Sequence, residues 1–203
     1  MASKIIVDQL EKTGGALAAL TLPVANATAN QVLKNDGAGA LSWSTPASAG
    51  LSTASQWRLT SDFTNAADPI TTNLAAAGTP LGFGALGTAL TAPLGIFTFP
   101  AGGTGYWLIN FQWFGHSGGN DTATATIKTT TNNSTWADSA TSHVRVGSST
   151  YAGTTSCSYI MKVVDITLDK VSFRVTVTNT GMTTRGDADV NETCMTFIKL
   201  GGL

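Results

Sequence analysis

Apolar and polar side chains alternate along much of the chain, most clearly in the segment 170–178. Val171, Phe173, Val175 and Val177 occupy every second position there, and the residues between them are polar or charged. This pattern predicts a strand with one buried and one solvated face. Similar short runs, separated by turn-rich stretches, predict strands at 55–62, 69–74, 95–100, 105–114, 123–130, 143–146, 157–164 and 193–200. Several short strands without helical periodicity are typical of an all-β sandwich or barrel.

Two of the expected strands carry apolar side chains on both faces. In 105–114 one face holds Trp107, Ile109, Phe111 and Trp113, and the other holds Tyr106, Leu108 and Phe114 with two amides. In the last strand, Cys194, Ile198 and Leu200 alternate with Met195 and Phe197. A strand that is apolar on both faces needs two packing partners. The opposite sheet supplies one of them, and we expect a neighbouring subunit to supply the other.

The first 50 residues differ in character from the rest. Their apolar side chains are few and irregularly spaced, and the main ones are Ile5, Ile6, Val7, Leu10, Leu20 and Leu22. Such a set cannot form a hydrophobic core by itself. A stretch of small residues at 44–50 separates this segment from the remainder of the chain. We therefore expect an extended docking arm and linker at 1–50, which orders on a partner or on trimer formation, and one β domain at 51–203.

Part of the arm carries a recognisable motif. Residues 21–43 read Thr-Leu-Pro-Val-Ala-Asn-Ala-Thr-Ala-Asn-Gln-Val-Leu-Lys-Asn-Asp-Gly-Ala-Gly-Ala-Leu-Ser-Trp. This run resembles a segment common in fibre and spike proteins of bacterial viruses. Its physical content is two short strands, 31–34 and 40–43, around a glycine-rich turn, and a generic surface hairpin is the alternative interpretation. The resemblance implies an arm that docks onto capsid or tail proteins of a virus particle.

The domain expected at 51–203 carries a second resemblance. Residues 96–111 read Ile-Phe-Thr-Phe-Pro-Ala-Gly-Gly-Thr-Gly-Tyr-Trp-Leu-Ile-Asn-Phe, and residues 191–201 read Asn-Glu-Thr-Cys-Met-Thr-Phe-Ile-Lys-Leu-Gly. Together with 163–171, these runs resemble the globular jelly-roll head of the complement C1q and tumour-necrosis-factor superfamily. Between 115 and 155 the chain departs from that pattern, so loop functions do not carry over.

The second resemblance implies a homotrimeric jelly-roll β-sandwich that binds partners and runs no chemistry. It also implies that the strand after the glycine turn and the last strand lie near the three-fold axis. The residues expected at the trimer interface are therefore Tyr106, Leu108, Phe111, Trp113, Met195 and Phe197.

Composition agrees with this interpretation. Only 11% of the residues are charged and 42% are apolar, whereas a soluble domain carries about a quarter charged residues. The shortfall suggests that other subunits cover much of the surface. The net charge of −1 argues against a nucleic-acid partner, and no run approaches the roughly 18 apolar residues of a membrane span. The apolar stretch at 5–7 is too short for a signal peptide, so we expect synthesis in a cytosol.

Groups that could carry chemistry are sparse. His116 and His143 fall in different segments without the ligands or partners of a metal site or a triad. Asp187 and Asp189 resemble a minimal calcium loop, but a solvated turn is the favoured interpretation because a third ligand is missing. A polysaccharide-cleaving spike would need a pair of carboxylates, and the acidic residues are too scattered to nominate one. We expect no enzymatic activity, no metal and no cofactor.

The two cysteines, Cys157 and Cys194, each lie within an expected strand. Buried free thiols are the favoured interpretation, because a small apolar cysteine suits a core. A disulfide is the alternative if the two strands are neighbours with compatible geometry.

The expected loops 115–121, 130–138 and 147–156 are polar and rich in small residues. Trp136 stands out in the second loop, because a tryptophan among asparagine and serine suits a sugar or protein ligand. The alternative is that Trp136 plugs the edge of the core. The residues expected to contact a host surface are His116, Asn133 and Trp136.

The leading hypothesis is a non-enzymatic structural protein of a bacterial virus, located on the capsid surface or the tail. A short tail fibre, a head fibre and a capsid-decoration protein remain open, as do host attachment and capsid stabilisation. The expected partners are two further copies of the chain, virion proteins and a host-surface glycan or protein. The alternative is a secreted C1q-like lectin or adhesion head of cellular origin, which predicts a signal peptide.

Overall fold

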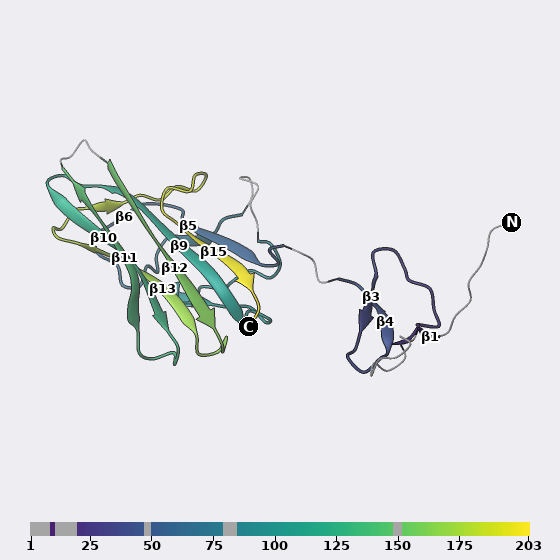
Figure 1. Ribbon diagram of the computed structural model, residues 1–203. Helices are drawn as coiled ribbons and strands as arrows, with labels where there is room; N and C mark the ends of the chain where they lie inside the picture. Colours follow the sequence, from purple (N-terminus) through teal and green to yellow (C-terminus); the bar gives the residue numbers. More distant parts are fainter. Residues whose placement is uncertain (1–8, 11–19, 47–49, 79–84, 148–151) are drawn as a thin grey trace. The chain divides into compact units, whose positions relative to one another are not determined.

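The computed structural model describes residues 9–10, 20–46, 50–78, 85–147 and 152–203 (Figure 1). Contacts divide the chain into two compact units, Met1–Gly50 and Leu51–Leu203, which we call the arm and the head. The only helical element in these described ranges is the short 3₁₀ turn η1 (Pro93–Gly95). A helix with the length and apolar character of a membrane span is therefore not found in this part of the chain.

The arm contains two small antiparallel pairs. Strand β1 (Gln9–Leu10) pairs with β2 (Leu20–Thr21), and β3 (Val32–Asn35) pairs with β4 (Leu41–Ser44). The second pair confirms the expected hairpin, displaced by one residue. Of the arm residues singled out above, Leu20 and Leu22 are half-buried, and Ile5, Ile6 and Val7 lie outside the described residues.

Hydrogen bonds rather than a core hold the described part of the arm together. Asp36 Oδ1 accepts the backbone N–H groups of Ala38 at 2.7 Å and Ala40 at 3.0 Å, which closes the hairpin turn. Trp43 Nε1 donates to the Ala25 carbonyl at 2.7 Å. None of residues 20–46 is buried, so this stretch contributes no hydrophobic interior.

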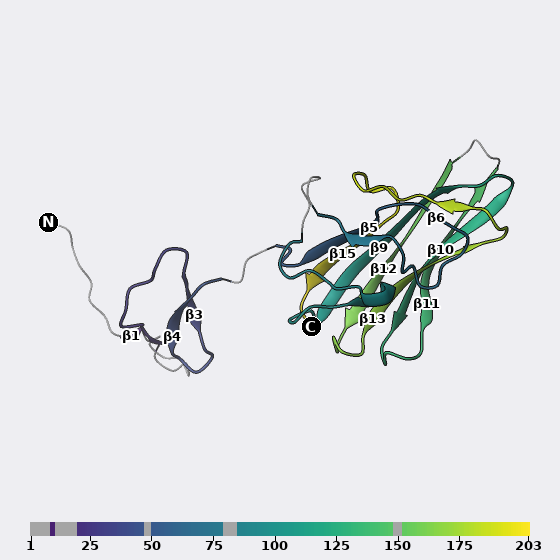
Figure 2. The ribbon, with the colours of Figure 1, turned by 180° about the vertical axis from the view of Figure 1, so that it is seen from behind.

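The head is a sandwich of two sheets whose long strands run lengthwise between its ends (Figures 1 and 2). The smaller sheet has the order β11 (Ala137–Val146), β10 (Asp121–Thr130), β13 (Lys170–Val177) and β8 (Phe97–Thr98). The larger sheet has the order β6 (Phe63–Thr64), β14 (Thr183–Thr184), β9 (Gly105–His116), β15 (Cys194–Gly201), β5 (Ala54–Leu59) and β7 (Leu74–Ala76). Strand β12 (Ala152–Val163) also pairs with β9, along its full length. The all-β sandwich expected from the sequence is confirmed.

Aromatic side chains fill the space between the sheets. Phe97 of β8 lies with its ring centroid 5.2 Å from that of Phe173 and 4.9 Å from that of Phe197. Phe111 of β9 packs on Phe173 at 5.0 Å. All four rings are at most 1% exposed. Such contacts between rings stabilise a core beyond the burial of apolar area alone.

Both cysteines are buried and free, as expected. Cys157 points between the sheets, where its Sγ lies 3.7 Å from the Ala125 carbonyl. Cys194 stands opposite Gln112 on the other face of the same sheet. Because the two thiols project from opposite faces, they cannot form a disulfide within the protomer. Burial raises the pKa of both thiols.

Most of the expected strands are confirmed, with two differences. The expected strand at 69–74 is wrong, because β7 covers only Leu74–Ala76. Strands β11 and β12 begin earlier than expected, at Ala137 and Ala152. Their first halves consist largely of small polar residues, which are common in loops but here are paired with neighbouring strands.

The pairing registers define the two ends of the sandwich. Ala54, near the start of the head, pairs with Ile198, which in turn pairs with Leu108. The turn 164–169 follows β12 at this same end, because Val163 pairs with Gly105. The turn 131–136 lies beside it, since the Asn133 N–H donates to the Leu168 carbonyl at 3.0 Å. We call this end the linker end. The opposite end, which we call the far end, carries the 117–120 turn.

Candidate subunit interface

Strand β9 shows how the larger sheet separates its two faces. Its residues alternate between buried and at least partly exposed along the whole strand. The buried set, which includes Phe111 and Trp113, points toward the smaller sheet. The other set starts with Tyr106 and Leu108 and ends with Phe114 and His116, and it lies on the face turned away from the smaller sheet. We call this the outward face.

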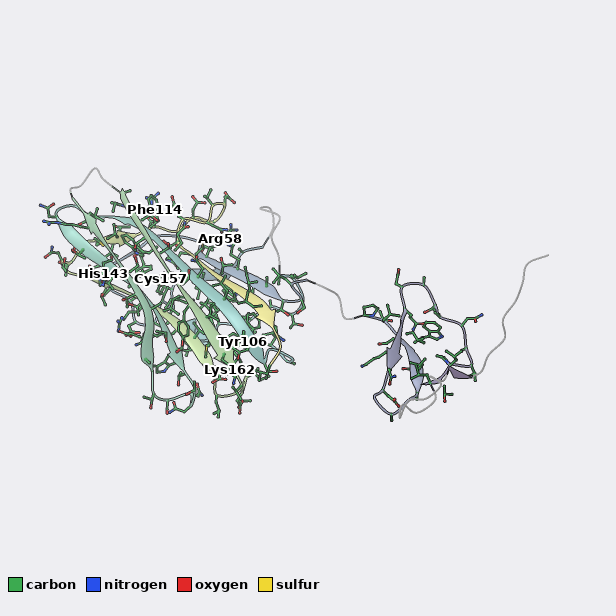
Figure 3. The ribbon with its side chains drawn as sticks, in the orientation of Figure 1. Arg58, Tyr106, Phe114, His143, Cys157 and Lys162 are labelled. Carbon is green, nitrogen blue, oxygen red and sulfur yellow. The ribbon has the colours of Figure 1, made fainter. Side chains whose placement is uncertain are left out.

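An apolar row crosses the outward face near the linker end. Leu108 pairs with Ile160 on one side and with Ile198 on the other, and Ile198 pairs with Ala54. Ile160 is 58% exposed and the neighbouring Tyr106 is 43% exposed. Figure 3 shows Tyr106 beside its cross-strand partner Lys162 near this end and Phe114 toward the other. Residues Ile160, Leu108, Ile198 and Ala54 are called the apolar row below.

The next row toward the far end is polar, and its groups bond to one another. Asn110 Nδ2 donates to Ser158 Oγ at 2.9 Å. Gln56 Nε2 donates to Thr196 Oγ1 at 2.9 Å, and Asn191 Nδ2 donates to Gln56 Oε1 at 2.8 Å. Side chains paired in this way can be covered by another surface with less cost than unpaired ones.

The segment 185–192 lies against the far-end half of this face. Gln112 Nε2 donates to the Glu192 carbonyl at 3.0 Å, and the Asp187 N–H donates to the Leu59 carbonyl at 3.0 Å. The buried Arg58 guanidinium lies 3.5 Å from the Asn191 side-chain oxygen. This segment leaves uncovered the apolar row, the polar row beside it, and Tyr106 with its partner Lys162.

The expected trimer-interface set needs correction. Phe111, Trp113, Met195 and Phe197 are 0% exposed within a single protomer, so a neighbouring subunit cannot contact them. The strands do have two apolar faces, but the set combined residues from both. Tyr106 and Leu108 lie on the outward face, whereas Phe111 and Trp113 stand an odd number of residues further along the strand and therefore point inward.

Two outward residues were missed by the expected set. Ile198 was recognised as facing away from Phe197, and strict period-two counting would have included it. Ile160 lies in the expected strand 157–164 and pairs with Leu108. Only the pairing of β12 with β9 reveals this contact, and the sequence pattern of a single strand carries no information about its partner.

The expected host-contact residues do not form one site. His116 ends β9 at the far end. Asn133 and Trp136 lie in the 131–136 turn at the linker end, where Asn133 adopts a positive φ of 55°. Trp136 is half-buried. A single ligand cannot bridge residues at opposite ends of the sandwich, so the grouping is wrong even though each residue remains accessible.

The polar candidates make ordinary structural contacts. His143 Nδ1 lies 2.8 Å from Thr124 Oγ1 on the neighbouring strand. Asp187 Oδ1 accepts the N–H groups of Asp189 at 2.6 Å and Val190 at 3.0 Å, and these bonds lower the pKa of Asp187. Among the described residues, no three His, Cys, Asp or Glu side chains come close enough to hold a metal ion.

Solved structures resemble the head, although no protein-family model and no curated protein matches the chain. The Eiger TNF of S. frugiperda is 13% identical and aligns over 74% of this chain and 93% of that chain, with a TM-score of 0.52. Murine APRIL is 11% identical over 73% of this chain and 98% of that chain, with a TM-score of 0.51. The PRD1 vertex protein P5 is 15% identical over 75% and 99% of the two chains, with a TM-score of 0.45, and that likeness carries no conclusion. At such identities the first two show the fold alone: the head is a jelly roll of the tumour-necrosis-factor type, as expected.

Proposed function

We propose that this jelly-roll protein is a non-enzymatic structural component of a bacterial virus. It assembles as a homotrimer through the outward face of the larger sheet and attaches to capsid or tail proteins through its arm. The observation that carries the proposal is the apolar row, in which Ile160 is 58% exposed while Leu108 and Ile198 beside it are only half-buried. The resemblance of residues 21–43 to segments of phage fibre and spike proteins supports the viral setting.

The apolar row supports self-association. Ile160 is 58% exposed although its neighbours across the sheet are also apolar. Exposed apolar patches of this kind mark surfaces that bind another protein. A second copy of the chain is the favoured occupant, because the C1q and tumour-necrosis-factor resemblance implies a trimer with this sheet near the axis. The adjoining polar row is internally hydrogen-bonded, which suits coverage by a neighbour.

The arm supports attachment to a larger structure. None of residues 20–46 is buried, and Val24, Val32 and Leu33 are 108%, 50% and 42% exposed. A short β-rich segment of this kind gains stability by adding strands to a partner or by packing on it. The partner proposed here is a protein of the virus particle, and both the capsid and the tail satisfy this argument.

Light scattering on the purified full-length chain tests the assembly. We expect a mass about three times 20.8 kDa. A chain that stays monomeric at micromolar concentration would contradict the trimer. The matched preparation is the head alone, residues 51–203, which contains the whole described core and should give a trimer of correspondingly smaller mass.

Particle incorporation tests the role of the arm. Virus particles lacking the protein are mixed with the full-length chain or with the head alone, then purified and labelled with antibody for electron microscopy. We expect label only with the full-length chain, on the capsid surface or the tail. Equal labelling by the head alone would refute arm-mediated docking. Absence of label in both samples would reject the virion role and favour a secreted adhesion head.

A further inference from the structure

A pocket of about 220 Å³ opens on the smaller sheet, on the face turned away from the larger one. Its lining residues are Asp68, Pro69, Ile96, Lys128, Trp136 and Ser172. Lys128 of β10 and Ser172 of β13 are cross-strand partners and form its floor. The volume lies below the roughly 300–1,000 Å³ of sites for drug-sized ligands, so the pocket suits one small ring.

The polar side of the pocket is a fixed ion pair. Lys128 Nζ lies 2.9 Å from Asp68 Oδ1 and 2.8 Å from Asp68 Oδ2. Behind it, the Arg174 guanidinium lies 3.8 Å from Asp68 and also pairs with Asp138. The positive charges of Lys128 and Arg174 thus balance the negative charges of Asp68 and Asp138. The pocket presents a carboxylate acceptor and an ammonium donor side by side, without net charge.

The apolar side of the pocket is built from Trp136, Pro69 and Ile96. Trp136 is half-buried, so part of its indole remains available to a ligand while the rest anchors it. Ser172 is only 2% exposed and adds a hydroxyl at the base. A ligand that fills this space must therefore be apolar on one side and hydrogen-bonding on the other.

We infer that this pocket binds a neutral pyranose sugar, as a unit of a surface glycan. A pyranose has a C–H face that packs on an indole, and neighbouring hydroxyls that can donate to Asp68 and accept from Lys128. Small pockets with few convergent polar groups fix the orientation of such ligands. An apolar peptide side chain fits less well, because it would desolvate the Asp68–Lys128 pair without replacing its contacts with water.

The site rests on the proposed function in one respect, that the trimer uses the larger sheet. The pocket lies on the opposite side of the sandwich from the outward face, so contact through that face does not cover it. Each trimer then carries three pockets, and many trimers on one particle multiply weak single contacts into firm attachment. Because the pocket is neutral, its binding should depend little on salt.

Saturation-transfer NMR with the full-length protein tests the inference directly. The probes are the methyl glycosides of glucose, galactose, mannose, N-acetylglucosamine and N-acetylgalactosamine. We expect at least one to receive saturation at its ring C–H protons. Trp136→Ala and Asp68→Asn should each weaken its binding about tenfold or more, as expected for a central contact.

Asp138→Asn is the matched control. It removes a charge from the same ion-pair network but no group that lines the pocket, so binding should stay within about twofold of wild type. Absence of saturation for every glycoside, or equal binding by Trp136→Ala, would overturn the sugar site. Binding to host cells that survives periodate but not protease would overturn it in favour of a protein ligand. Light scattering on the same samples separates the two proposals, because a trimer without sugar binding rejects only the pocket.

Discussion

Replacing Ile160 by aspartate is the sharpest test of the proposed interface. Ile160 sits in the apolar row and is 58% exposed in the protomer. A charged side chain at this position should therefore leave the protomer fold intact. In a trimer built on the outward face, the same carboxylate would be forced into a dry contact.

The size of the effect follows from the exposed fraction. Complete burial of an isoleucine stabilises by about 1.5–3 kcal/mol, so covering the exposed part of Ile160 contributes about 1–2 kcal/mol per protomer. Three-fold symmetry repeats the contact, which gives about 3–5 kcal/mol per trimer. Losing this amount lowers the association constant about 10²- to 10⁴-fold. The unpaired carboxylate increases the loss further.

Light scattering across a concentration series measures the mass, and circular dichroism on the same samples measures the fold. We expect Ile160→Asp to be monomeric with a wild-type spectrum. Leu94→Asp is the control, because Leu94 is 82% exposed but belongs to η1, away from the outward face. A full trimer mass for Ile160→Asp would refute the reasoning, and so would an unfolded spectrum.

Three further perturbations address the core, the thiols and a buried acid. Phe111→Ala should lower the free energy of unfolding in urea by about 3–5 kcal/mol, because Phe111 is 0% exposed in the protomer; a loss under about 1 kcal/mol would contradict its inward orientation. Burial raises the pKa of Cys157 and Cys194, so Ellman's reagent at pH 8 should react with both thiols in urea and only slowly in the native protein. For Asp121, burial alone raises the pKa, but hydrogen bonds led by that from Thr178 outweigh it and hold the pKa below its ordinary value. A carboxylate whose pKa is lowered in the folded state stabilises the fold at pH values above its unfolded pKa of about 3.9, and this contribution is lost as the pH falls below that value. Asp121→Asn should therefore have a smaller free energy of unfolding than wild type at pH 7, and the difference between the two proteins should narrow below about pH 4. A difference that stays constant with pH would contradict a lowered pKa for Asp121.

The sequence predicted the elements that depend on strict periodicity. Strand β13 was expected at 170–178 and covers Lys170–Val177, because Val171, Phe173 and Val175 alternate cleanly with polar residues. The hairpin of the arm was expected within one residue, since its glycine-rich turn has a recognisable composition. In both cases the information is local to the segment.

The site depended on information that is not local. Trp136 was recognised as unusual, but its pocket exists only because β10, β13 and the segment around Asp68 come together. The ion pair between Asp68 and Lys128 joins residues 60 positions apart. A single sequence predicts alternation within a strand, whereas the neighbour of each strand is decided by packing of the whole sandwich.

The placement of both termini of the head at the linker end has a practical consequence for labelling and display. A tag added after Leu203 would emerge at the same end as the linker, since β15 finishes beside Tyr106. The 117–120 turn lies at the far end, and an added side-chain carbon at Gly118 or Gly119 would meet no atom within 4 Å. Peptides inserted between these two glycines should stand at the end of the head opposite the linker and be tolerated by the fold, which makes this turn the natural position for an epitope or a dye.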